Sequence, residues 1–264
     1  MITSWVRTLV ATCLAASAPF VQAERDHRWV SARPGIVKPA QAYFTNLSSG
    51  DKIETPYLVK FGLSRLGLAG IERAVPHAGH HHLLINQDLP LNFTTPLPFT
   101  DKYVHFGKGQ MEAVIDLPPG QYALRLLLAD DKHLPTFAYS PAVQVTVTAR
   151  RAGIDANALV KRGVALLSPS EGQSLQPPFL VRFHASGLNV GHIDVKAHDA
   201  GHFRLVAQLA NGKVERLDWP GGQTEAWIDP PAGAIKLHAE LVSNADTSKV
   251  IAKSTPIGVT VLAR

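Results

Sequence analysis

The chain has 264 residues, of which 45% are hydrophobic and 18% charged, with 26 basic, 21 acidic and 12 histidine residues. This length predicts one or two domains, and this composition excludes both a disordered tail and a bundle of membrane helices. The net charge of +5 comes from scattered Lys and Arg, so we predict no nucleic-acid partner.

Residues 1–23 have the pattern of a Sec-type secretory signal peptide. Arg7 supplies the positive charge, residues 8–21 are an apolar stretch, and Ala23 ends a small-residue cleavage site. The apolar stretch is too short to span a bilayer, so we expect a periplasmic or secreted protein without stable membrane insertion after cleavage. Cleavage removes Cys13, the only cysteine, so the mature chain is predicted to have no disulfide and no thiolate ligand.

The rest of the chain contains two copies of one unit. After a predicted N-terminal arm or leading strand at residues 24–41, segment 47–61 matches segment 169–183. Segment 109–120 matches segment 222–233, and nearly the same number of residues separates the two copies as in the first match. Several matches preserved in the same order indicate a tandem repeat whose second copy is degenerate.

Each copy consists of short β-type runs punctuated by Gly, Pro, Asn and Asp, without helical periodicity. In the run 122–128, alternate residues are apolar, as a strand with one buried face requires. We therefore predict an all-β chain with two tandem immunoglobulin-like β-sandwich domains. The expected boundaries are a His-rich domain at 42–149, a linker at 150–163 and the degenerate second domain at 164–264.

Six histidines lie in the first copy, and their spacing points to a metal site. His80 and His82 project to one face of a predicted strand, with His81 on the other. Several converging neutral imidazoles suit a borderline divalent cation. We therefore predict Cu(II) or Zn(II) as the possible cofactor, with His80, His82, His105 and His133 as ligands. His81, Glu112 and Asp131 are expected to orient these ligands, with a structural role as the alternative for His81. The carboxylates of Asp101, Glu112, Asp130 and Asp131 are possible ligands themselves or partners that fix the histidine tautomers.

The second copy is an internal control for this interpretation. It has His202, Phe203, Arg204, Asp218 and Asp246 at the positions of His80, His81, His82, His105 and His133. A structural role common to both copies would have kept the histidines in both. The alternative is that the histidines form a hydrogen-bonded strut, in a non-enzymatic module that binds an exported protein, a peptide or a cell-wall saccharide.

Four segments resemble a bacterial exported family, domain of unknown function 4399. They are GHHHLLIN at 79–86, HFGKGQME at 105–112, DLPPG at 116–120 and LLLADDKHLP at 126–135. The resemblance extends over about 42–147 and, weakly, 164–261. It implies a small β-sandwich domain behind a signal peptide, with no established activity. The family pattern ends in D-H-N-H-x-P-H, whereas this chain keeps His133 and has Lys132 at another histidine position.

No motif of a known catalytic class is present. The sequence lacks the G-x-S-x-G elbow, the P-loop, H-E-x-x-H and zinc-finger spacings, so we predict a binding protein rather than an enzyme. Trp29, Trp219 and Trp227 could form a platform for a glycan or peptide, or belong to the core. The predicted partner is a metal ion or another component of the cell envelope.

Overall fold

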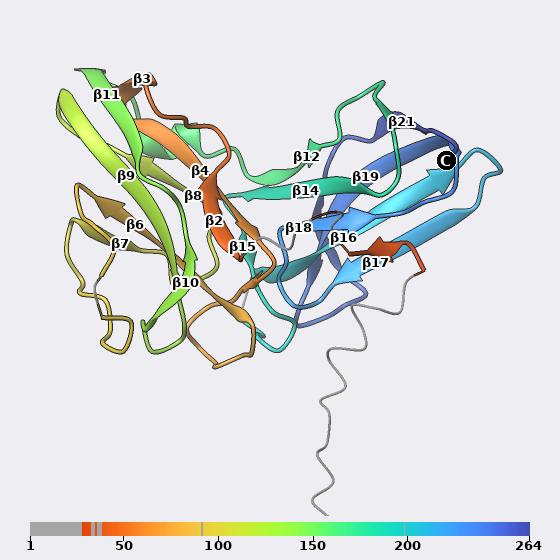
Figure 1. The fold of residues 1–264 in the computed structure, drawn as a ribbon, viewed down its shortest axis with the longest axis horizontal. Coiled ribbons are helices and arrows are strands. Elements are labelled where there is room, and N and C mark those ends of the chain that lie inside the picture. The colour runs from red at the N-terminus through yellow and green to blue at the C-terminus, as the bar shows by residue number, and fades with distance from the viewer. Residues whose placement is uncertain (1–27, 33–34, 36–38, 91, 198) are drawn as a thin grey trace, which may run out of the picture.

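The computed structural model describes residues 28–32, 35, 39–90, 92–197 and 199–264. The regular secondary structure of this part of the chain consists of β-strands in two lobes that lie side by side (Figure 1), apart from one short 3-10 helix, η1 (Ala156–Leu159). None of its helices is long and apolar enough to cross a membrane. The predicted signal peptide, residues 1–23, lies outside the described residues.

The first lobe is a sandwich of a seven-stranded and a three-stranded sheet. The larger sheet has the order β3-β11-β9-β6-β5, with β7 on β6 and β10 on β9. Its strands are β3 (Lys52–Thr55), β5 (Gly67–Leu68), β6 (Ala78–Ile85), β7 (Tyr103–His105), β9 (Gly120–Ala129), β10 (Pro135–Tyr139) and β11 (Val143–Arg150). The smaller sheet has the order β2-β4-β8 and consists of β2 (Gln41–Phe44), β4 (Tyr57–Ser64) and β8 (Glu112–Ile115).

The second lobe repeats this arrangement strand for strand. Its larger sheet has the order β13-β21-β19-β16-β15, with β17 on β16 and β20 on β19, and its smaller sheet contains β12-β14-β18. The strands are β12 (Gly163–Ser168), β13 (Ser174–Leu175), β14 (Phe179–Ser186), β15 (Asn189–Val190), β16 (Ala200–Leu209), β17 (Val214–Trp219), β18 (Glu225–Ile228), β19 (Gly233–Ser243), β20 (Val250–Lys253) and β21 (Ile257–Val261). The prediction of two tandem β-sandwiches is confirmed.

The N-terminal segment packs against the distant lobe. Its strand β1 (Val30–Ser31) pairs with β18, so the smaller sheet of the second lobe has four strands. Trp29 is buried there, and its carbonyl accepts a hydrogen bond from the Asp229 N–H. The described part of the predicted arm is therefore tied to the second lobe, whereas Gln41 already begins β2 in the first.

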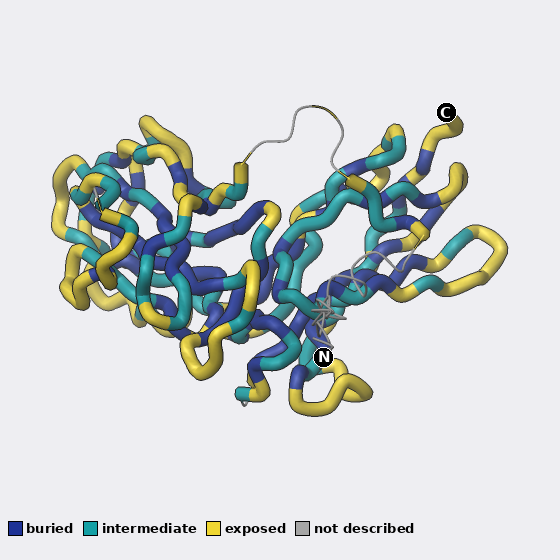
Figure 2. The backbone as a smooth tube through the Cα atoms, turned by 60° about the horizontal axis from the view of Figure 1, so that its bottom comes forward, coloured by how far each residue is buried: buried dark blue, intermediate teal, exposed yellow. Residues whose placement is uncertain are grey.

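Both faces of the larger sheet are buried along strand β9. Leu124, Leu126 and Leu128 belong to the main core, as the alternation predicts. Leu127 and Ala129 are also buried, because the long loop between β6 and β7 covers the outer face of the sheet with Leu97. Figure 2 shows buried segments running along the strands of both lobes, with the exposed ones at the turns.

The two lobes are joined by matching backbone contacts. The Leu68 N–H donates to Gly222 O at 2.8 Å, and the Val190 N–H donates to Gly109 O at 3.0 Å. Gly109 and Gly222 have positive φ, and a Cβ atom on either would lie within 2.2 Å of a carbonyl oxygen in the other lobe. The glycine of the repeated Gly-Gln segment is therefore required in both copies for the close approach of the lobes.

Candidate metal centre

Four histidine side chains meet on the outer face of the larger sheet in the first lobe. His80 and His82 project from β6, and His105 lies directly opposite His82 in the β6–β7 pairing. His133 comes from the turn between β9 and β10. Its φ is +62°, and Oδ1 of Asp130 accepts the Lys132 and Leu134 N–H groups on either side of it. Two strands and an ordered turn thus position the four rings.

The ring nitrogens are close enough to share one ion. Nε2 of His80 lies 2.9 Å from Nε2 of His82, and Nε2 of His133 lies 3.1 Å from Nε2 of His105. One nitrogen from each ring lies within 4.8 Å of the other three. A tetrahedral site with metal–nitrogen bonds of about 2.0–2.1 Å has nitrogens about 3.3–3.4 Å apart. The observed separations therefore fit such a site after small ring movements.

Burial keeps the His80 and His82 imidazoles neutral. Burial, and to a lesser extent the neighbouring histidines, lowers the pKa of His80 to about 2 and that of His82 to about 3. His105 is partly exposed, and burial together with His133 also lowers its pKa. Neutral imidazole is the form that binds metal ions, because its ring nitrogen then has a free lone pair.

Two buried ring nitrogens of the cluster lack a hydrogen-bond partner among the described residues. His80 and His82 are at most 1% exposed, and Nδ1 of each has no hydrogen-bond partner among the described residues. When one Nε2 donates to the other, the accepting ring must carry its proton at Nδ1, where no acceptor is present. An unpaired buried ring nitrogen of this kind costs about 1–3 kcal/mol. His81 bears the same kind of cost in the core, where both of its ring nitrogens lack a hydrogen-bond partner among the described residues.

The residues predicted to orient the ligands lie elsewhere. His81 is on the opposite face of β6, where its ring packs against Phe61 in the core, and burial lowers its pKa to about 3. Glu112 is at the contact between the lobes, where it accepts hydrogen bonds from His184 and Ser186. Asp130, rather than Asp131, orders the turn that carries His133. Among the described residues, no carboxylate contacts the four clustered rings.

Phe99 was not predicted as part of the site. Its ring centroid lies 4.7 Å from that of His133 and 5.4 Å from that of His105, both edge to face. The residue belongs to the loop between β6 and β7, at residues 86–102, which is much longer than its counterpart at 210–213 in the second lobe. This difference in loop length between the copies is the sequence signal that could have drawn attention to Phe99.

The second lobe fills the equivalent place with a closed polar network. Arg204 pairs with Asp218 in the β16–β17 register, as His82 does with His105, and its Nε donates to Asp218 at 2.8 Å. His202 hydrogen-bonds Asn244 at 2.8 Å and lies 3.5 Å from Asp218. Burial raises the pKa of Asp218, but the hydrogen bonds from His202 and Arg204 outweigh it and hold the pKa below its ordinary value. This position is satisfied without a ligand.

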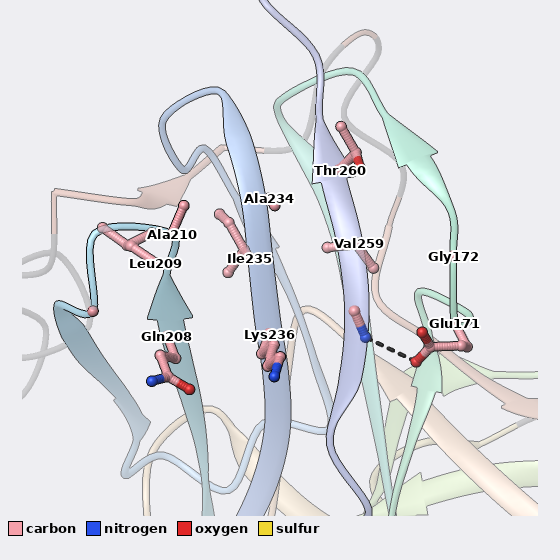
Figure 3. Close-up of a pocket in the computed structure, with 12 residues that line it drawn as sticks. Glu171, Gly172, Gln208, Leu209, Ala210, Ala234, Ile235, Lys236, Val259 and Thr260 are labelled. Atoms are coloured by element: carbon pink, nitrogen blue, oxygen red, sulfur yellow. Dashed lines mark hydrogen bonds between the residues drawn. The ribbon is translucent and has the colours of Figure 1, made fainter.

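Other features of the chain do not compete with this centre. A pocket in the second lobe lies over β16, β19 and β21 beside Glu171, whose carboxylate accepts the Gly258 N–H at 2.8 Å (Figure 3), and no histidine lines it. Two of the tryptophans considered for a binding platform, Trp29 and Trp219, are buried in the core. The four-histidine cluster is the arrangement in the described residues that could hold a metal.

The segment that contains the cluster matches a known family. Residues 59–148 match the family described as Domain of unknown function (DUF4399). This segment is a DUF4399 domain. It runs from β4 to β11, includes all four clustered histidines, and leaves the second lobe outside the match. The resemblance seen in the sequence motifs is therefore confirmed for the first lobe.

No curated protein matches the chain. Similar solved structures include the fibronectin(III)-like modules of Clostridium thermocellum CbhA, with 13% identity, 85% of this chain and 94% of that chain covered, and a TM-score of 0.24. The chicken CNTN1 FN1–FN3 domains have 10% identity, with 81% of this chain and 66% of that chain covered and a TM-score of 0.26. Dimeric latent PorU from Porphyromonas gingivalis has 13% identity, with 88% of this chain and 22% of that chain covered and a TM-score of 0.30.

Proposed function

We propose that this is an exported protein whose DUF4399 domain binds one divalent transition-metal ion, Zn(II) or Cu(II), through His80, His82, His105 and His133. The observation that supports the proposal is the convergence of four ring nitrogens within 4.8 Å. Export is proposed from the signal-like pattern of residues 1–23.

The donor set favours these two metals. Imidazole nitrogen suits Zn(II) and Cu(II), whereas Cu(I) prefers thiolate and thioether sulfur. Met111 is fully buried in the main core, and Cys13 lies within the proposed signal peptide. Since the chain has a net charge of +5, coordination rather than long-range attraction must supply the affinity for a cation.

The number of ligands favours binding over catalysis. Catalytic zinc sites use three protein ligands and keep a fourth position for water or substrate, whereas four protein ligands complete a tetrahedral site. With four imidazoles around one ion, zinc would have no open position. We therefore propose a carrier or storage role for the DUF4399 domain and no enzymatic activity.

The test is calorimetric titration of the chain from residue 24 onward with Zn(II) and with Cu(II). We expect one ion per chain and a Kd of about 1 μM or tighter for at least one metal. His105→Ala and His133→Ala remove ligands that are partly exposed, so these variants should fold and bind at least about tenfold more weakly. The control is His77→Asn, which changes an exposed histidine outside the cluster.

Two results would contradict the proposal. The first is no binding of either metal tighter than about 0.1 mM. The second is binding that His77→Asn weakens as much as His105→Ala does. Either result would leave the alternative, a module whose histidines serve the packing of the first lobe.

A further inference from the structure

Two of the four histidines are buried and two are partly exposed. His80 and His82 on β6 are at most 1% exposed, whereas His105 and His133 are partly exposed. An ion that enters or leaves must therefore pass between or beside the two outer rings. Phe99 lies on this side, with its ring edge to face against both of them.

The loop that carries Phe99 is anchored on either side of it. Leu97 is buried with Leu84, Leu127 and Ala129 on the outer face of the larger sheet, and its N–H donates to the carbonyl of His133 at 2.9 Å. Thr100 forms a β-bridge with Tyr103, whose N–H donates to the Thr100 carbonyl at 3.1 Å. The backbone around Phe99 is thus fixed, while the side chain between the two anchors can rotate about its own bonds.

The Phe99 ring is not part of the core. The residue is 66% exposed, although a phenylalanine gains free energy when it is buried. Its observed ring contacts are with His105 and His133. Aromatic contacts of this kind hold a ring in place only weakly, so the ring can leave and return.

We propose that Phe99 is the gate of the metal centre: its ring covers His105 and His133 and sets the rate at which the ion exchanges. This proposal rests on the metal-binding function proposed above. A ring that must swing aside for the ion to pass slows capture and release alike. Removing it therefore changes the rates of exchange and leaves the affinity nearly unchanged.

The experiment measures the rate of zinc release to an excess of a chromogenic chelator in a stopped-flow instrument. Wild type is compared with Phe99→Ala, Phe99→Leu and the control Phe137→Ala. Phe137 is also in the first lobe and is 76% exposed, but its ring stacks on Phe93 rather than on a histidine. The control therefore removes a similarly exposed aromatic ring that does not contact the clustered histidines.

We expect release from Phe99→Ala to be about tenfold faster than from wild type, Phe99→Leu to be intermediate, and Phe137→Ala to be unchanged. The Kd of Phe99→Ala should stay within about threefold of wild type, because capture is accelerated too. Tight zinc binding with the same release rate in Phe99→Ala and wild type would overturn the gate alone. Equal acceleration by Phe137→Ala would also overturn it, whereas absence of zinc binding in wild type would overturn the proposed function as well.

Discussion

Replacing His80 and His82 together by leucine should stabilise the metal-free protein while abolishing metal binding. Both residues are at most 1% exposed, and they share one hydrogen bond between their Nε2 atoms at 2.9 Å. The pair leaves two buried Nδ1 atoms without a partner among the described residues. A double substitution by apolar groups of similar size removes both unpaired atoms, and it leaves no second imidazole without its hydrogen-bond partner.

The magnitude follows from these contacts. Each unsatisfied buried polar atom costs about 1–3 kcal/mol, and the lost hydrogen bond is worth about 0.5–1.5 kcal/mol. Imperfect packing of the new leucines offsets part of the gain. We therefore expect the free energy of unfolding of the metal-free protein to rise by about 1–3 kcal/mol, measured by urea denaturation in the presence of EDTA.

A matched substitution in the second lobe serves as a control, because it is expected to lower the stability instead of raising it. His202 occupies the position of His80, but its ring is hydrogen-bonded to Asn244 and lies beside Asp218. His202→Leu leaves Asn244 and Asp218 without this imidazole partner, so it should lower the free energy of unfolding by about 1–3 kcal/mol. If the His80→Leu/His82→Leu protein were instead destabilised by more than about 1 kcal/mol without metal, the histidines would be a structural strut and the reasoning would be refuted.

Two further predictions concern metal loading and acid. Zinc at about 100 times its Kd should raise the free energy of unfolding by about 2.7 kcal/mol and the Tm by about 5–10 °C, as measured by calorimetry; an unchanged Tm would argue against binding to the folded state. The second prediction concerns Glu112. Burial raises the pKa of this carboxyl, but hydrogen bonds from His184, Ser186 and the Gly187 N–H outweigh it and hold the pKa below its ordinary value. Its contribution to stability is therefore present above the pKa of the unfolded chain and is lost as the pH falls through the lower folded value. Glu112→Gln should be less stable than wild type at pH 7, and the difference should shrink as the pH falls through the lowered pKa of the folded protein; a difference independent of pH would show that the charge has no role.

Local pattern was enough to predict the sandwich strands and the gathering of the four imidazoles. His80 and His82 are two residues apart, which on a strand places them on one face. His105 and His133 lie beside the ends of predicted strands, where loops can bring them close to this pair, and the pairing of β6 with β7 brings His105 opposite His82. These features depend on strand alternation and on neighbouring strands, both of which are readable from the residues.

Contacts between distant segments could not be read in this way. Glu112 finds its partners His184 and Ser186 in the other lobe, so its position beside the histidines in sequence was misleading. Phe99 reaches the cluster only because Leu97 anchors its loop on the outer face of the sheet. The choice of Asp130 over Asp131 depends on the geometry of the turn that presents His133.

Four imidazoles of the DUF4399 domain are proposed to hold one metal ion. X-ray absorption spectroscopy at the zinc edge, on protein loaded with one equivalent of zinc, tests it most directly. We predict four imidazole nitrogens at about 2.0–2.1 Å, and three in His105→Ala, with a fourth ligand from solvent. A spectrum with oxygen ligands and fewer than three imidazoles in the wild-type protein would contradict the account.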